Sequence, residues 1–460
     1  MGDGSTAFRY GNEDDWAVGG PSGAPAPTKT ERWGPYGGRP IKLLALVAMI
    51  DSVDRGILPG VLTKVQDDLG FSDTAAGVLG SVFVLTGFLV VLPAGYLADR
   101  RTRTRIIAVV MVSWGAISAL NAGVRAYWQF LMVRAALGIG ETIDNPASSS
   151  LTADYYAPAV RGRAFAVKGV APIVGTALGT AIGGLVGSLF GWRWAFLIVG
   201  VPGSLLALAV WRLPEPARGG SDDSAAVALE PPEIVDRRGI QAFILDMRAA
   251  ARVRSLRSLM AGSAIASGAT AGLAFWAPAF YERHTSLGSG GSAATTGALI
   301  LVGALAGTWI GGIACDRLRP KYDGAPMLVA GIAQFLGGIT LMATFLPTPL
   351  WFRMPFQAIG VALIVAGGPA LATMISEVVS PAIRGTAYSV IAFLGAIAGA
   401  ASPLVLGIIA DQFPITVDGE TKGHIANAFL IVTPLVCVGA LIVLRGRRYV
   451  REDIAAANRG

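Results

Sequence analysis

Cysteine and histidine are nearly absent from the sequence, with two of each among 460 residues. Cys315 and Cys437 lie in or at the end of apolar runs, where small packing residues are expected, and they form no CxxC pair. His284 and His424 have no partners at metal-ligand spacing. The sequence also lacks a nucleophile–base, metal or nucleotide motif. We therefore expect no disulfide framework, no metal or other cofactor, and no enzyme activity.

Charge is also scarce. Charged residues make up 15% of the chain, against about 25% in soluble domains, while 53% of the residues are hydrophobic. These values indicate an integral membrane protein. The net charge of +7 comes from arginines in loops on one side of the apolar runs, including 100–105, 161–163, 317–321 and 445–451. This positive-inside pattern predicts two cytoplasmic termini, and it does not indicate nucleic-acid binding. The Ala/Gly/Arg-rich composition suggests a bacterial source, and hence a multi-pass protein of the cytoplasmic membrane.

Apolar windows of about 20 residues, the length that crosses a ~30 Å hydrocarbon layer, recur twelve times along the chain. We place them near 41–64, 75–98, 105–123, 127–152, 164–189, 193–213, 257–281, 294–316, 325–346, 349–377, 385–411 and 425–444. The polar segment 214–256 separates them into an N-terminal half, 41–213, and a C-terminal half, 257–444. Residues 1–40 and 445–460 are expected to be cytoplasmic tails, the first of them disordered.

The segment 214–256 begins as a polar linker and continues as the basic amphipathic stretch IQAFILDMRAAARVRSLRS. We predict that this second part is a helix lying on the cytoplasmic membrane surface. A membrane anchor is the favoured interpretation of that helix, and a regulatory role is the alternative.

The two halves carry related motifs. ADYYAPAVRGRAFA at 153–166 aligns with SEVVSPAIRGTAYS at 376–389, at an offset of 223 residues. GYLADRRTR at 95–103 aligns with GGIACDRLR, which pairs Asp99 with Asp316. Several motifs repeated in the same order indicate internal duplication. The sequence therefore predicts an all-α membrane protein with twelve transmembrane helices in two six-helix, pseudo-symmetric halves.

The GYLADRRTR motif resembles the loop between the second and third helices of the major facilitator superfamily, which repeats it six spans later. This resemblance implies a secondary transporter in which two halves rock around a central site. An aspartate among arginines at a helix end can form a charge-assisted latch between the halves. A plain topogenic loop explains the arginines but neither Gly95 nor Asp99. We therefore predict a cytoplasmic gate formed by Gly95, Asp99, Arg100, Arg103, Asp154, Arg161, Asp316, Arg317, Glu377 and Arg384.

The fifth window contains GTALGTAIGG at 175–184, with glycines at four-residue spacing. This spacing predicts close helix packing. The stretch also resembles an antiporter signature of the superfamily, with Thr180 in place of the proline of that signature.

The first window carries three ionisable residues, which are costly inside a membrane and indicate function. Asp51 and Arg55 are i,i+4 neighbours, so we expect them to pair on one helix face. Asp54 is three residues from Asp51, and two like charges in a poorly solvated place favour proton exchange. Pro59 has no backbone N–H to donate to the carbonyl oxygen of Arg55, so we expect the helix to be bent or loosened there.

The fourth window carries a second polar set. Arg134 and Glu141 lie two turns apart on one face, and Asp144 follows Glu141 by three residues. We predict that Asp51, Asp54 and Glu141 carry protons and that Arg55, Arg134 and Asp144 bind substrate. The alternative is that these residues form internal salt bridges that only join the first and fourth helices. For Asp144, and for Lys168 of the fifth window, this alternative stands equal to a functional role.

Three stretches, 53–83, 95–100 and 133–142, are similar to the spinster family of lipid transporters. The matching residues are Asp54-Arg55, Phe71-Ser72-Asp73, and the run from Arg134 through Gly138 and Gly140 to Glu141. One departure is Asp51, at a position where asparagine is usual. The resemblance covers mainly residues 49–170. It implies transport of lysophospholipids or sphingosine phosphate, with proton coupling in bacterial members.

An amphipathic lipid with an anionic head needs a cation near the head and an apolar wall for its chain. The nearly uncharged C-terminal half offers Phe275, Trp276, Phe280, Phe356 and Phe393 for that wall, although core packing explains each of them taken singly. We expect a monomeric, proton-coupled transporter of lysophospholipid-like molecules, in contact with membrane lipids. The alternatives are a drug or organic-anion exporter of the same fold, and a non-transporting receptor or scaffold.

Overall fold

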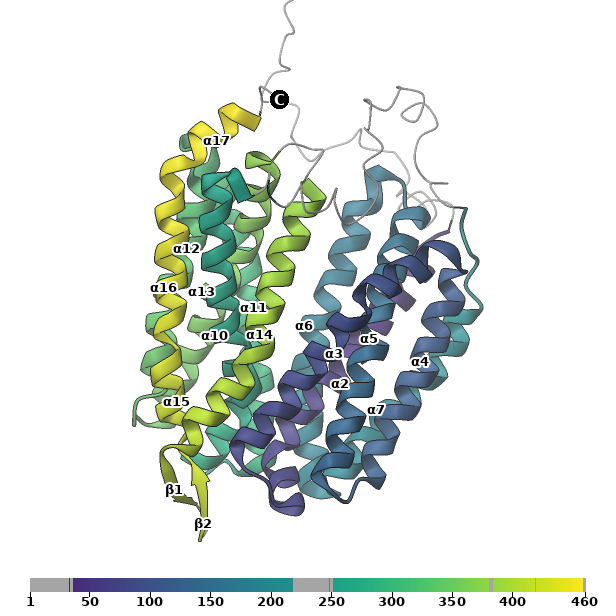
Figure 1. The fold of residues 1–460 in the computed structure, drawn as a ribbon, viewed down its shortest axis with the longest axis vertical. Coiled ribbons are helices and arrows are strands. Elements are labelled where there is room, and N and C mark those ends of the chain that lie inside the picture. Colours follow the sequence, from purple (N-terminus) through teal and green to yellow (C-terminus); the bar gives the residue numbers. More distant parts are fainter. Residues whose placement is uncertain are drawn as a thin grey trace, which may run out of the picture.

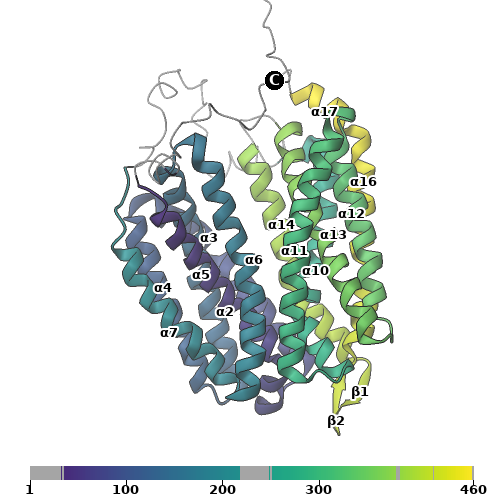
Figure 2. The same ribbon diagram turned by 180° about the vertical axis from the view of Figure 1, so that it is seen from behind.

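The computed structural model describes residues 36–217, 251–379, 384–417 and 419–457, together with Trp33 and Arg248. Two groups of long helices stand side by side in both views (Figures 1 and 2). One end of the molecule carries the last helix, α17 (Val450–Ala457), and we name it the α17 end. The opposite end carries a two-stranded hairpin, and we name it the hairpin end.

The N-terminal half consists of six long helices and one short 3₁₀ turn. They are α2 (Arg39–Leu69), α3 (Asp73–Arg100), α4 (Arg103–Leu120), η2 (Asn121–Gly123), α5 (Tyr127–Tyr155), α6 (Pro158–Leu189) and α7 (Trp192–Trp211). Each of the first six predicted windows falls on one of these long helices. The helices run a few residues past most window edges, and α2 continues through Pro59 as helix.

The C-terminal half repeats this arrangement with α10 (Arg254–His284), α11 (Gly288–Leu318), η3 (Arg319–Lys321), α12 (Ala325–Thr344), α13 (Leu350–Val378), α14 (Arg384–Asp411), α15 (Ile425–Val432), α16 (Pro434–Gly446) and η5 (Arg447–Tyr449). The last window is divided between α15 and α16, because Pro434 offers no N–H to continue the helix. The antiparallel hairpin of β1 (Pro414–Val417) and β2 (Glu420–Gly423) was not predicted.

Ten described helical segments are long and apolar enough to cross a membrane. The long helices α2 and α5 are not among these ten, and they are the two that carry the buried charges of the first and fourth windows. The all-α, two-half architecture predicted from the sequence is confirmed. The predicted amphipathic helix of the linker falls mostly outside the described residues, and α10 begins at Arg254.

Helices α2 and α6 pack backbone to backbone through glycines, as the GTALGTAIGG stretch predicted. A Cβ at Gly179 would lie 2.0 Å from the carbonyl oxygen of Val53, and a Cβ at Gly56 would lie 2.4 Å from that of Thr176. Neither position leaves room for a side chain. This close crossing fixes the side of α2 that packs inside the half, and therefore also the side that faces the partner half.

The halves meet along two helix pairs, α3 with α14 and α6 with α11. Gly77 of α3 approaches the carbonyl of Pro403, and Gly297 of α11 approaches that of Ala177, both too closely for a Cβ. Gly184 and Ala293 make a similar contact. All of these residues lie toward the hairpin end of their helices, so the described contacts hold the halves together mainly there.

Candidate functional site

A cavity of about 650 Å³ lies between the halves. Its walls come from α2, α3, α5 and α6, and from Ala396 of α14 in the other half. The α2 residues that line it, Ala48, Asp51 and Arg55, fall between the helix start at the α17 end and the helix middle. The cavity therefore lies on the α17 side of the molecule's centre. Its size is typical of small-molecule sites.

One wall of the cavity carries the predicted ion pair. Arg55 donates to the Asp51 carboxylate across one helical turn, and it also donates to Ser52 Oγ at 3.2 Å. The Arg55 side chain remains 44% exposed and that of Asp51 20% exposed, so both can meet a solute. The same-face pairing predicted from the i,i+4 spacing is present in the structure.

A second cation and a second acid complete the polar part of the cavity. Lys168 of α6 and Asp144 of α5 both line it, and Lys168 donates to Ser149 Oγ at 2.9 Å. Asp144 lies close enough to Asp51 for the two carboxylates to repel each other. One carboxylate oxygen of Asp144 is buried without a hydrogen-bond partner in the described part of the chain. The cavity is thus lined by two cations and two acids.

Asp54 does not line this cavity. It is 0% exposed and points into the N-terminal half, where Ser118 of α4 donates to its carboxylate. Asp54 lies about 100° around the helix axis from Arg55, and the rotation of α2 against its neighbours turns it toward α4 rather than toward the cavity. The acid that meets Asp51 in the cavity is therefore Asp144 of α5, although Asp54 still lies within electrostatic range of Asp51.

Arg134 is also inside the N-terminal half rather than at the cavity. It is 2% exposed, and its guanidinium lies over the rings of Phe130 and Phe196, at 5.5 and 5.3 Å from their centroids. Its charge acts on Asp54. Asp54 of α2 and Arg134 of α5 thus lie within electrostatic range of each other inside the N-terminal half. Glu141 lies on α5, but its side chain falls outside the described residues.

The five predicted aromatics are divided among several places. Phe393 is 52% exposed and stands edge-on to Phe88, a cavity residue, at 5.5 Å between centroids. Phe275 packs at Gly80, where the halves touch. The other three lie away from the cavity. Trp276 is 1% exposed and bonded to the carbonyl of Pro403, Phe280 packs in the core on His284 and Phe429, and Phe356 stacks on Phe352. The aromatic part of the cavity wall comes instead from Phe83, Phe88 and Phe165.

The predicted cytoplasmic gate includes a buried arginine. Arg103 is 0% exposed and binds Asp154, Glu215 Oε1 at 2.8 Å and Ser150 Oγ at 2.7 Å. All of these partners belong to the N-terminal half or to the chain that leaves it. In this conformation the described contacts of Arg103 therefore join α4, α5 and the end of α7, rather than joining the two halves.

Burial opposes the ionisation of Glu215, but hydrogen bonds from Arg103 and Thr104 outweigh that effect and hold the pKa of this carboxyl below its ordinary value. Elsewhere in the predicted gate, Arg161 donates to the carbonyl of Tyr156 at 3.0 Å, and Asp316 and Arg317 are exposed. The positions Gly95, Asp99, Arg100, Glu377 and Arg384 lie on α3, α13 and α14, and their side chains fall outside the described residues.

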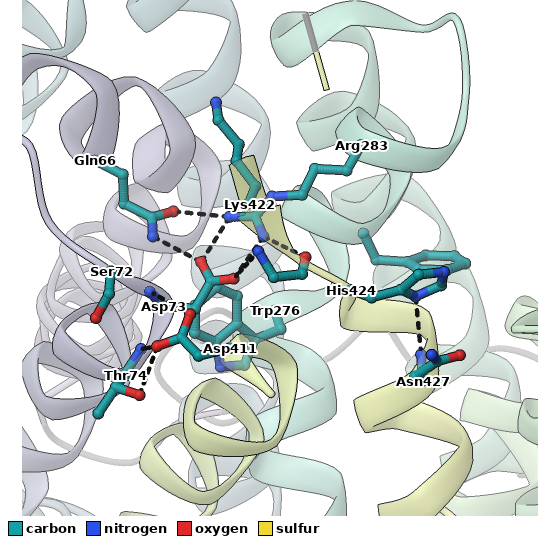
Figure 3. Close-up of polar contacts among 12 residues, drawn as sticks. Gln66, Ser72, Asp73, Thr74, Trp276, Arg283, Asp411, Lys422, His424 and Asn427 are labelled. Atoms are coloured by element: carbon teal, nitrogen blue, oxygen red, sulfur yellow. Dashed lines mark hydrogen bonds and ion pairs between the residues drawn. The ribbon is translucent and has the colours of Figure 1, made fainter. Parts of the chain in front are cut away.

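An ionic lock at the hairpin end was not predicted from the sequence (Figure 3). Arg283 of α10 forms two hydrogen bonds with the Asp73 carboxylate of α3, each 2.7 Å long, and both side chains are 2% exposed. Gln66 of α2 donates to the same carboxylate at 2.8 Å, and the Gly423 N–H donates at 3.1 Å. We call Gln66, Asp73, Arg283 and Gly423 the hairpin-end lock.

Further contacts surround the lock. Asp411 of α14 accepts from the Thr74 N–H at 2.8 Å and from the Thr74 hydroxyl at 2.6 Å (Figure 3). Lys422 pairs with Asp67 at 2.7 Å. Each bond joins one half to the other, so the hairpin end is closed. Asp73 and Arg283 are 210 positions apart in the sequence, and no local pattern connects them.

Two helical halves around a mixed polar and apolar cavity, closed at one end by ion pairs, define a membrane transporter rather than an enzyme. The family model described as Major Facilitator Superfamily matches residues 44–403, and the chain belongs to that superfamily. Within it the chain is a spinster-type member, as the sequence predicted.

Three curated relatives of the superfamily are similar to this chain, and two of them are spinster-type proteins. Protein spinster homolog 3 from Danio rerio is 26% identical, over 98% of this chain and 93% of its own length. An MFS-type efflux pump from Mycolicibacterium smegmatis is 30% identical, over 91% of this chain and 94% of its own length. The sphingosine-1-phosphate transporter SPNS2 from Danio rerio is 26% identical, over 80% of this chain and 75% of its own length.

A solved structure has the same fold. It is a bacterial homolog of the human lysosomal transporter spinster, in an inward-facing and unoccupied conformation. Its TM-score with this chain is 0.75 at 22% identity, and the match covers 93% of this chain and 98% of that one.

Proposed function

We propose that this protein is a proton-coupled transporter of amphipathic, phosphate-bearing lipids of the lysophospholipid type. The observation that carries the proposal is that charged side chains and aromatic rings line the same central cavity. Arg55 and Lys168 offer cations to a phosphate, and charge-assisted hydrogen bonds of this kind are strong. The rings of Phe83, Phe88 and Phe165 offer a surface for an acyl or alkyl chain. The relative SPNS2 is named for a substrate of this chemistry.

Asp51 and Asp144 are the proposed proton carriers at the cavity. Asp54, which lies inside the N-terminal half, and Glu141 of α5 remain further candidates. An anionic head group that competes with Asp51 for Arg55 leaves the Asp51 carboxylate without its ion pair. A carboxylate that loses its cation and faces a second acid takes up a proton more readily. Substrate binding and protonation are coupled in this way through a single arginine.

We further propose that the α17 end faces the cytoplasm, because the arginine-rich loops lie there. With the hairpin end closed by the lock, the cavity in this conformation then belongs to an inward-facing state. Release of the lock, with closure of the opposite end around the proposed cytoplasmic gate, gives the other state.

The test is transport in reconstituted vesicles under an imposed pH gradient. Uptake of radiolabelled lysophosphatidylglycerol is expected to depend on the gradient. Arg55→Gln and Lys168→Gln should each weaken the apparent substrate affinity by roughly 10–100-fold, as expected for loss of a charge-assisted hydrogen bond. Lys42→Gln removes an exposed cation from the first turn of α2 and is the matched control. Gradient-independent flux, or equal effects of the three substitutions, would contradict the proposal.

The similarity to an MFS-type efflux pump favours a second candidate, the export of drugs or organic anions. The same cavity chemistry suits an organic acid without a long chain. Competition separates the two candidates. A chain-length series of lysolipids should compete more strongly as the chain grows if the apolar wall is used, whereas small organic acids should be the stronger competitors if it is not.

A further inference from the structure

A second pocket lies on the outside of the C-terminal half. None of its lining residues also lines the central cavity. It has a volume of about 410 Å³ and is formed by α12, α16 and η5. Leu328 and Ile332 come from the first turns of α12, and Leu441 and Leu444 come from the last turns of α16. Arg445, Arg447 and Arg448 complete it. We call this pocket the α12–α16 groove.

The groove lies at the α17 end, where the helices leave the membrane. Beside it the two helices are in tight contact, since a Cβ at Gly331 would lie 2.4 Å from the Leu444 side chain. Ile332 and Leu441 are 44% and 52% exposed and face outward, on the side that membrane lipid contacts. The pocket therefore has an apolar part at membrane depth and a cationic part at the level of the head groups.

The three arginines of the groove differ from their cationic neighbours. Arg254 has Glu452 at 3.9 Å, and Arg451 has Asp323 at 3.4 Å. Arg445, Arg447 and Arg448 are all exposed, and they have no carboxylate partner among the described residues. Three cations at one pocket without an acid favour an anionic ligand, and the guanidinium fork matches phosphate geometry.

We propose that the α12–α16 groove binds an anionic membrane phospholipid, with its phosphate at the three arginines and one acyl chain along Leu328, Ile332 and Leu441. A basic pocket between helices at a membrane boundary is the expected form of such a site. The bound lipid joins α12 to α16 across the outer surface of the C-terminal half. This site is separate from the proposed transport cavity and does not depend on the transported substrate.

The test measures lipids retained by the full-length protein after extraction from nanodiscs of equal phosphatidylglycerol and phosphatidylcholine content, by native mass spectrometry. The wild type should retain one phosphatidylglycerol in preference to phosphatidylcholine. The variant R445Q/R447Q/R448Q should lose this preference, with a fall in apparent affinity of roughly two orders of magnitude for three lost cations. R254Q/R257Q/R451Q removes the same charge from the same end of the molecule and should retain the lipid.

A third variant tests the apolar part alone. Ile332→Trp fills the groove at an exposed position, where folding should be unaffected, and it leaves all three arginines in place. It should reduce phosphatidylglycerol retention at least about fivefold. Equal losses in the two charge-neutralised triple variants would show diffuse surface attraction and would overturn the proposal. Retention of phosphatidylglycerol by Ile332→Trp at the wild-type level would overturn the placement of the chain in the groove.

Discussion

The hairpin-end lock holds the two halves together in the conformation described above. Asp73 and Arg283 form a bidentate pair with both side chains 2% exposed, and the pair joins α3 of one half to α10 of the other. Removing one partner of a buried pair costs about 3–5 kcal/mol, because the remaining charge stays buried without compensation. When the hairpin end opens, that charge reaches water, so the cost applies only to the closed state. Arg283→Gln should therefore shift the equilibrium toward the state open at the hairpin end by about two to three and a half orders of magnitude.

The assay measures the distance between the halves by electron–electron resonance. Spin labels at Leu189 and Leu346, both exposed at the hairpin end on different halves, report opening there. The labels are placed in a background in which Cys315 and Cys437 are alanine. Arg283→Gln should add a population at longer distance, and Asp73→Asn should do the same. In the double variant, the gain in the longer-distance population should be smaller than the gains of the two single variants added together, since the double variant leaves no uncompensated charge.

The matched control is Asp68→Asn, which breaks the pair of Asp68 and Arg193 at 2.9 Å. That pair lies at the same end of the molecule, but both residues belong to the N-terminal half, and their side chains are 43% and 36% exposed. An exposed pair contributes about 0–1 kcal/mol, and this one does not join the halves. The role of the lock in holding the halves closed is refuted if Asp68→Asn and Arg283→Gln change the distance distribution alike, or if neither changes it.

Three further predictions concern other parts of the molecule. Glu215→Gln should lower the free energy of unfolding by about 1–3 kcal/mol in chemical denaturation at neutral pH, because Arg103 loses a charged partner. Since the folded-state pKa of Glu215 lies below its ordinary 4.5, this difference between wild type and variant should be complete above that pH and should disappear as the pH falls through the folded value. Gly56→Ala should destabilise the protein by about 1–3 kcal/mol through overpacking of α2 on α6, and Gly312→Ala, whose Cβ meets nothing within 4 Å, should leave the melting temperature unchanged. Asp51→Asn should alter the pH dependence of transport, and an unaltered profile would exclude Asp51 as a proton carrier.

Much of the fold could be predicted from local patterns. A window of about 20 apolar residues has to cross the membrane as a helix, since no water is available there for unpaired backbone groups. Close helix packing by α6 could be predicted from the glycine spacing at 175–184, because small residues at that interval form a flat stripe on a helix. That its partner is α2 came only from the structure. The hairpin of β1 and β2 was missed, although the sequence places Asp418-Gly419, a typical two-residue hairpin turn, between Val417 and Glu420.

The candidate site could be predicted only in part. The pairing of Asp51 with Arg55 is a property of one helix, so their spacing sufficed. The separation of Asp54 from the cavity, and the meeting of Asp51 with Asp144, depend on how α2 is rotated against α4, α5 and α6. That rotation is set by close contacts such as Gly179 on Val53, which involve residues more than a hundred positions apart.

The sequence by itself determined that this protein is a two-half helical membrane transporter and where its rare intramembrane charges lie along the chain. It did so because membrane insertion and helix periodicity are local physics. Only the tertiary structure decided which charges share a cavity, which are buried inside one half, and which residues close the hairpin end. Those outcomes depend on contacts such as Asp73 with Arg283, whose partners are brought together by the packing of whole helices.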